Sequence, residues 1–157
     1  MKHLYQDAYF DEIITIEKAN TPEQVFEALS QEAAKHIDYP ASKIHTLLND
    51  NHQRRRGSIG QGVTIPQLKI KGLKAPLTLL AKLKSPVKFE QALDHKHIDI
   101  ACLTLSPERI GPIHLTRLAK ITRILKDEET CAMIRETNDN EALKTLLNNP
   151  DGWLIAA

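Results

Sequence analysis

A glycine-rich stretch that leads into an apolar segment contains the residues best suited to bind an anion. It reads Gly57-Ser58-Ile59-Gly60-Gln61-Gly62-Val63-Thr64-Ile65-Pro66-Gln67. Its backbone N–H groups could face a phosphate. The candidate binding residues within it are Ser58, Gly60, Gly62 and Thr64. The stretch lacks the Gly-Lys-Ser/Thr of a Walker loop and the spacing of a dinucleotide fingerprint, so a simple turn into a strand is the competing interpretation.

Basic residues and histidines elsewhere add further candidates. Arg54, Arg55 and Arg56 directly precede the glycines, and guanidinium groups bind phosphate in a forked geometry, although a solvated loop also explains them. His114 stands at a predicted helix start and could lie beside Gln67; a partly buried capping histidine is the alternative. His95 and His97 have no third ligand nearby in the sequence, so we predict no metal site and no cofactor.

The run from Gly60 to Pro66 resembles the active-site segment of the enzyme IIA domains of the mannitol/fructose type, including the nitrogen-regulatory branch of the phosphotransferase system. In that family the pattern reads Ile-Gly-x-Gly-(Ile/Val)-Ala-(Ile/Val)-Pro-His-Gly, and the histidine accepts the phosphoryl group. The resemblance puts Gln67 at the acceptor position and Leu68 at the following glycine.

This difference at Gln67 changes the chemistry. Neutral imidazole offers a nucleophilic nitrogen lone pair near pH 7. The lone pair of the glutamine nitrogen is delocalised into the carbonyl, so an amide exchanges hydrogen bonds but forms no phospho-intermediate. We therefore predict that the usual reaction is lost at this site.

The resemblance extends over residues 12–148. Ser85–Phe89 and Ile98–Pro107 are similar to a strand pair of the family, and Ile113–Ala119 is similar to the helix with its second active-site histidine, which matches His114. The Arg-Glu pair that precedes the glycine loop in the family falls on Asn51 and His52. The family's phosphoryl-stabilising arginine is thus not matched.

Length and composition indicate one cytoplasmic domain. The 157 residues are 41% hydrophobic, enough to bury a core, and we expect a single enzyme-IIA-like domain over residues 1–157. Cys102 and Cys131 lie in apolar stretches and are predicted to be reduced core residues. The sequence contains no membrane-length apolar run, and its N-terminus is too polar for a signal peptide.

Strand and helix patterns alternate, which predicts an α/β fold with a single mixed β-sheet flanked by helices on both faces. Strands are expected at 13–16, 63–70, 77–83 and 98–105, the last of them central. A helix is expected to begin with Thr21 as cap, Pro22 at its first position and Gln24 in a capping box. A second, short helix is expected to open at Tyr39-Pro40, with Ile44, Leu47 and Leu48 on its apolar side. Further helices are expected from Gly111-Pro112 to 125, through 131–134, and from an Asn138 cap to 147. The buried stripe of the helix after Gly111 is predicted to comprise Leu115, Leu118, Ile121 and Leu125.

Two segments have no regular pattern. Residues 49–62 are expected to form an exposed loop. The apolar tail, residues 152–157, is expected to dock on the body of the protein or on a second copy in a homodimer.

Three functions fit these observations. The first, which we favour, is a regulatory, phosphorylation-incompetent enzyme-IIA-like protein that binds regulatory protein partners, among them a histidine-containing phosphocarrier protein, as the family resemblance implies. The second is a phosphocarrier that uses another histidine, His114 or His52. The third is a module that binds an anion or nucleic acid through residues 54–88, a segment with nine of the 21 basic residues and none of the 20 acidic ones. The segment 54–88 has no aromatic residue on which bases could stack, which counts against binding of a nucleic acid.

Overall fold

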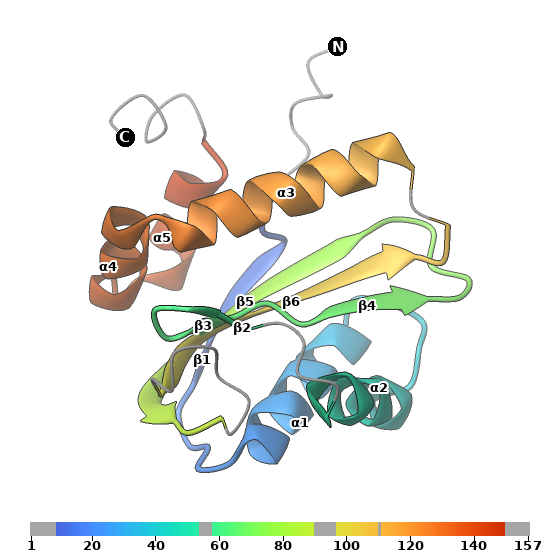
Figure 1. Cartoon of the computed structure of the whole chain (residues 1–157), viewed down its shortest axis with the longest axis horizontal. Coiled ribbons are helices and arrows are strands. Elements are labelled where there is room, and N and C mark those ends of the chain that lie inside the picture. Colours follow the sequence, from blue (N-terminus) through green and yellow to red (C-terminus); the bar gives the residue numbers. More distant parts are fainter. Residues whose placement is uncertain (1–8, 54–57, 90–96, 110, 150–157) are drawn as a thin grey trace.

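A computed structural model describes residues 9–53, 58–89, 97–109 and 111–149. Strands and helices interleave along the chain as predicted (Figure 1). The elements in order are β1 (Glu12–Ile16), α1 (Pro22–Ala34), α2 (Ala41–Gln53), β2 (Ser58–Gly60), β3 (Val63–Thr64), β4 (Gln67–Ile70), β5 (Leu77–Val87), β6 (Ile98–Pro107), α3 (Pro112–Lys126), α4 (Glu128–Glu136) and α5 (Asn140–Leu147). None of the helices in the described ranges is long and apolar enough to cross a membrane.

The strands form one mixed six-stranded sheet with the order β1-β5-β6-β3-β2, and β4 also pairs with β6. Strand β6 is central: β5 runs antiparallel to it on one side, while β3 and then β4 run parallel to it on the other. Nearly every residue of β6 is buried, as predicted for a strand covered on both faces.

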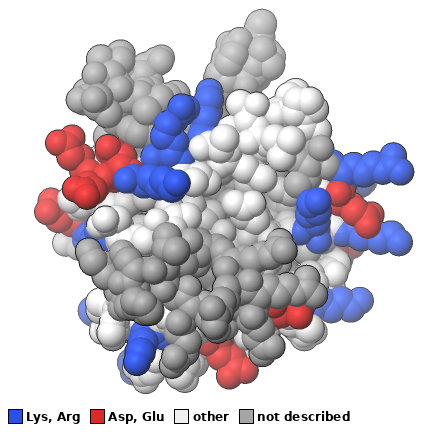
Figure 2. Space-filling view, in the orientation of Figure 1, with Lys and Arg blue, Asp and Glu red and all other residues white. Residues whose placement is uncertain are grey.

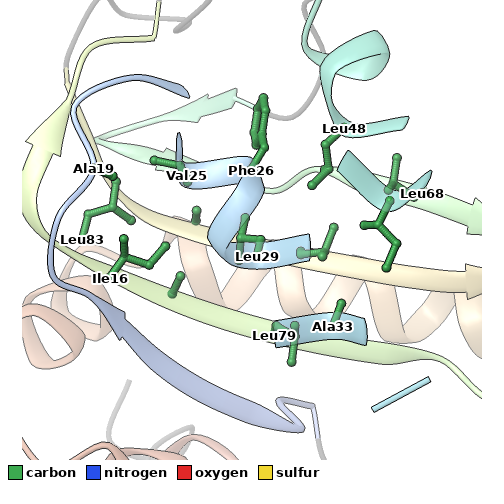
Figure 3. Packing of buried hydrophobic residues seen from close by; sticks show 14 of the residues in the cluster. Ile16, Ala19, Val25, Phe26, Leu29, Ala33, Leu48, Leu68, Leu79 and Leu83 are labelled. Atoms are coloured by element: carbon green, nitrogen blue, oxygen red, sulfur yellow. The ribbon is translucent and has the colours of Figure 1, made fainter. Parts of the chain in front are cut away.

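Helices cover both faces of the sheet, which confirms the predicted fold (Figure 1). Because side chains alternate along a strand, β6 sends Ala101 and Leu103 to one core and Ile100 and Cys102 to the other. The first core lies under α1 and α2, where Phe26, Leu29 and Leu48 pack toward Leu79 and Leu68 of the sheet (Figure 3). The second lies under α3, α4 and α5.

Both cysteines belong to the second core. Cys102 and Cys131 are free and buried, and burial raises the pKa of both thiols. They are therefore apolar packing residues in the described fold, as expected.

The helix starts follow the predicted capping chemistry with two shifts of detail. Thr21 caps α1 by accepting a hydrogen bond from the Gln24 N–H. The Gln24 side chain accepts from the Asn20 N–H at 2.7 Å, one residue earlier than in a capping box. Asp139, rather than the predicted Asn138, caps α5, because its carboxylate reaches two backbone N–H groups at 3.0 and 3.2 Å.

The predicted exposed loop over residues 49–62 is wrong at its start and at its end. Helix α2 continues to Gln53, because a helix needs only one apolar face and Ile44 and Leu48 supply it. At the other end the strands begin earlier, and Gly60 and Gly62 are buried.

The predicted burial of Leu115 is also wrong, since 56% of this residue is exposed. Helix α3 buries residues of its second half, namely Ile121, Ile124 and Leu125. The tail at residues 152–157 lies outside the described residues.

Candidate functional site

The glycine stretch forms a tight turn between β2 and β3. Gly60, Gln61 and Gly62 all have left-handed backbone angles, with φ of 89°, 58° and 79°, a region that glycine enters without strain. Arg135 of α4 holds this turn: its guanidinium donates to the Gln61 carbonyl at 2.7 Å and to both carboxylate oxygens of Asp99 at 2.8 and 2.9 Å. The turn is thus fastened to β6 and to α4.

From this turn the chain runs along β6 toward Gln67. Thr64 is buried in β3. Pro66 has no N–H for the sheet, but its carbonyl accepts a hydrogen bond from the Thr104 N–H at 3.0 Å. Pairing with β6 resumes at Gln67, the first residue of β4. The side chain of Gln67 is exposed, while the next residue, Leu68, points into the first core.

A pocket of about 200 Å³ lies beside Gln67, where α2, β4, β6 and α3 approach one another. The Asn51 side-chain amide of α2 donates to the Gln67 carbonyl at 3.1 Å, so two of the positions that differ from the family pattern are in direct contact. The pocket is lined by Asn51, Ile65, Gln67, Leu68, Lys69, Ser106 and Leu118.

His114 lies in the first turn of α3 and is half-buried. It is not part of the pocket lining, but Leu118, one turn further along the same helix face, is. The Nδ1 atom of His114 is enclosed and has no hydrogen-bond partner among the described residues. The structure therefore brings Gln67 together with Asn51 and with the helix of His114.

The remaining predicted site residues either are not among those that line this pocket or lie outside the described residues. Gly60, Gly62 and Thr64 are buried in the turn and in β3, and the backbone of Ser58 pairs with Thr64. Arg54, Arg55 and Arg56 lie outside the described residues, as do His95 and the His52 side chain. Binding roles for these residues stay predictions.

The sequence indicated Lys69 only as one of the nine basic residues of 54–88 and did not indicate Ser106. The two-residue period of a strand puts Lys69 on the same face as Gln67 and could have linked it to the site. Ser106 faces Lys69 only through the register of β4 against β6, which the sequence does not encode locally.

The pocket lining determines what chemistry fits. It offers an ammonium group, amides and a hydroxyl, and neither an imidazole nor a carboxylate. Such groups donate hydrogen bonds to an anion. Elsewhere in the described ranges, no three histidine, cysteine or acidic side chains gather in a way that could hold a metal ion.

Sequence comparison identifies relatives of the whole described region. The sequence pattern of the family "Phosphoenolpyruvate-dependent sugar phosphotransferase system, EIIA 2" matches residues 9–149. A nitrogen regulatory protein of Bradyrhizobium diazoefficiens is 30% identical over 133 residues, which are 85% of this chain and 86% of that protein. A nitrogen regulatory protein of Pseudomonas aeruginosa is 26% identical over 121 residues, covering 76% of this chain and 78% of that protein.

Solved structures share the fold. The nitrogen regulatory protein IIA-Ntr of Neisseria meningitidis superposes with a TM-score of 0.78 at 20% identity, over 85% of this chain and 92% of that one. The mannitol IIA of Escherichia coli superposes with a TM-score of 0.64 at 14% identity, over 85% of this chain and 94% of that one. Together with the family pattern, these findings confirm the family indicated by Gly60–Pro66: the chain belongs to the EIIA 2 family of the phosphoenolpyruvate-dependent sugar phosphotransferase system.

Proposed function

We propose that this chain is a regulatory EIIA protein of the nitrogen-regulatory kind that carries no phosphoryl group at residue 67. It acts, as one EIIA-like domain, by binding partner proteins. The observation that carries the proposal is the exposed amide of Gln67 at the start of β4, beside the pocket between α2 and α3. An amide there can hold a partner through hydrogen bonds but cannot accept phosphorus.

The charge of the site follows from the same residue. A phosphorylated side chain adds close to two negative charges at neutral pH, whereas Gln67 is always neutral. The chain then has the charge state of an unphosphorylated family member at all times. Its partners would respond to its amount in the cell rather than to its phosphorylation.

The relatives support a regulatory role. Two matched proteins are named nitrogen regulatory proteins, and the family belongs to a phosphotransferase system. Regulatory proteins and a histidine-containing phosphocarrier protein are therefore the partner classes that we propose.

Phosphoryl transfer tests the proposal directly. The protein is incubated with labelled phosphoenolpyruvate, the general phosphotransferase enzyme and a histidine phosphocarrier protein, beside a Gln67→His variant and an EIIA protein that has the histidine. We expect label on the variant and on the histidine-containing protein, and none on the original chain. Label on the original chain would contradict the proposal, and an unlabelled variant would contradict the assignment of residue 67.

Phosphoryl transfer through His114 is the second candidate, favoured by the position of this histidine one turn from the pocket-lining Leu118. Its Nδ1 atom is enclosed, so a carrier protein could meet only the Nε2 atom. Label that appears on the original chain and disappears in His114→Ala would support this candidate.

A further inference from the structure

Two apolar side chains at the start of α3 are exposed. Ile113 is 78% exposed and Leu115 is 56% exposed, on either side of His114. The buried residues of α3 all lie in its second half. Figure 2 shows uncharged side chains over the first half of this helix. Leu115 shares a face of α3 with Leu118, three residues further on, which lines the pocket. Ile113 is two residues from Leu115 and therefore points to another side of the helix. Leu115 and Leu118 together give the pocket an apolar side, as in many binding sites.

Basic side chains border these apolar residues. Lys69, Lys71 and Lys74 are exposed on β4 and on the turn after it, and Arg109 is exposed just after β6. The register of Ile70 against Pro107 brings these segments to the same end of the sheet. Lys and Arg side chains are visible along that edge of the molecule (Figure 2). Glu108 is the acidic residue among them.

The pocket lies next to this basic border and has the polarity to hold a carboxylate. Lys69, Gln67 and Ser106 are among its lining residues, and their side chains carry an ammonium group, an amide and a hydroxyl, all of which donate hydrogen bonds. A volume of about 200 Å³ is below the roughly 300–1,000 Å³ of sites for drug-sized ligands. One acidic side chain fits such a pocket better than a whole metabolite does.

We propose that this α3–β4 surface, defined as Lys69, Lys71, Lys74, Arg109, Leu115 and Leu118, binds a partner protein through an acidic segment that also presents an apolar side chain. A carboxylate of the partner enters the pocket and pairs with Lys69, while its apolar residue packs on Leu115 and Leu118. Pairing across an interface between opposite charges sets specificity and the association rate, and the apolar contact adds affinity. The inference rests on the proposed function, because it names the chemistry of the partner at that same site.

A nucleic acid is the competing ligand for a basic surface. Binding of single strands depends on aromatic side chains on which bases stack, and the α3–β4 surface has none. Its exposed side chains between the charges are aliphatic. These features favour an acidic protein segment.

The test uses a labelled synthetic peptide in which Leu and Glu recur at helical spacing. Matched peptides carry Gln or Lys in place of every Glu, and a single-stranded oligonucleotide of equal charge is the fourth probe. Fluorescence anisotropy measures the affinity, and NMR shifts of the isotope-labelled protein locate the binding residues. We expect the Glu peptide to bind at residues 67–74 and 108–118, at least about tenfold more tightly than the Gln peptide and more weakly at high salt.

Matched variants separate the contributions of charge and apolar surface. Lys69→Glu and Leu115→Ser should each weaken Glu-peptide binding at least about tenfold. Lys18→Glu, in the exposed connection after β1, and Leu146→Ser, at a leucine of α5 that is 45% exposed, should change it less than about twofold. Circular dichroism confirms that all four variants are folded.

Four results would overturn the inference: no binding of the Glu peptide, equal binding of the Gln or Lys peptide, tighter binding of the oligonucleotide, or a dimer in sedimentation that Leu115→Ser dissociates. The last would identify a second copy of the chain as the occupant. The phosphoryl-transfer assay on the same samples keeps the two claims apart. If the chain is unlabelled and does not bind the Glu peptide, this inference alone is rejected. If the chain is labelled, the proposed function is rejected, and the peptide measurement still decides whether the surface binds an acidic segment.

Discussion

Gly62 lies where both its backbone angle and its neighbours exclude a side chain. Its φ is +79°, and a Cβ atom there would meet the Asp99 carboxylate at 3.0 Å, the Arg135 guanidinium at 3.1 Å and the His97 carbonyl at 3.2 Å. Gly72 has a similar φ of +88°, but a Cβ atom there would meet nothing within 4 Å. Substitutions at the two glycines therefore distinguish the cost of backbone strain, which both share, from the cost of crowding, which only Gly62 has.

We expect Gly62→Ala to lower the free energy of unfolding by about 2–4 kcal/mol, because strain and crowding add. Gly72→Ala should cost about 1 kcal/mol, from strain alone. Urea denaturation followed by circular dichroism measures both. Equal losses at the two positions would mean that the Asp99–Arg135 pair moves aside freely and that the turn is not tightly held.

Asp11 is a partly buried acid whose ionisation opposes folding. Burial raises the pKa of its carboxyl above the ordinary 3.8, although the Thr78 N–H and the Arg117 guanidinium act in the opposite direction. The carboxylate accepts from the Thr78 N–H at 2.7 Å and lies 3.5 Å from the Arg117 guanidinium. The native state therefore binds a proton more tightly at this position than the unfolded state does.

With more protons bound in the native state, the free energy of unfolding falls as pH rises from about 4 through the raised pKa. Asp11→Asn keeps an acceptor for the Thr78 N–H and has no charge to bury. We expect the wild type to lose stability relative to this variant over that pH range, with a constant difference above it. Urea titrations at a series of pH values measure the difference. A relative gain by the wild type would mean that the ion pair with Arg117 outweighs burial.

Helix α4 holds the Gly60–Gly62 turn through the side chain of Arg135. Arg135 is the last basic residue of α4 and makes three hydrogen bonds to Asp99 and the Gln61 carbonyl. The pair is partly exposed, with 36% and 24% of the two side chains accessible, so solvent and salt weaken it. Its geometry, with two parallel bonds to one carboxylate, is nevertheless one that lysine cannot reproduce.

We expect Arg135→Ala to lower the free energy of unfolding by about 1–2 kcal/mol and to loosen the Gly60–Gly62 turn. Arg135→Lys should recover less than half of that loss. Arg123→Ala, at an exposed arginine of α3, is the control and should change stability by less than about 0.5 kcal/mol. Denaturation gives the energies, and hydrogen exchange at Val63 and Ile100 reports on the turn. If Arg135→Lys recovered all of the lost stability, Arg135 would contribute only through its positive charge.

Elements with strong local signals could be predicted, and those that depend on tertiary contacts could not. Thr21-Pro22 located the start of α1, because residues that cap a helix are recognisable in a sequence. The continuous apolar run of β6 located the central strand, because a strand that is buried on both faces has few polar residues. The end of α2 and the exposure of Leu115 could not be predicted, since both depend on where the neighbouring elements stop. At the site, Gln67 followed from the resemblance of Gly60–Pro66 to the family's active-site segment, whereas its contact with Asn51 depends on how α2 packs beside β4.

Charge is distributed unevenly over the whole molecule. The described lysines of residues 58–89 divide between the two ends of the sheet, with Lys69, Lys71 and Lys74 beside the pocket and Lys84 at the other end, where it pairs with Glu17 at 3.3 Å. Figure 2 shows acidic side chains gathered on the side of the molecule where α4 lies. One end of the molecule is thus suited to an acidic partner, while the opposite side would repel it.

The start and the end of the described chain are joined by one amide, Asn148. Its Oδ1 atom accepts from the Tyr9 N–H at 3.0 Å and from the Phe10 N–H at 2.9 Å, and its Nδ2 atom donates to the Phe10 carbonyl at 2.8 Å. The side chain thereby bonds to the segment before β1 as a neighbouring strand would. It also positions Phe10, which is fully buried in the second core.

Asn148→Ala removes all three hydrogen bonds and leaves two backbone N–H groups and a carbonyl without partners in a half-buried place. We expect the free energy of unfolding to fall by about 2–3 kcal/mol, and hydrogen exchange to rise at Phe10 and Leu147 together, because both sides of the junction loosen. Asn149→Ala, at the exposed neighbour, should cost less than about 0.5 kcal/mol. Faster exchange confined to Tyr9 and Phe10, with no change in α5, would mean that the helix does not depend on this junction and that Asn148 only anchors the N-terminal segment.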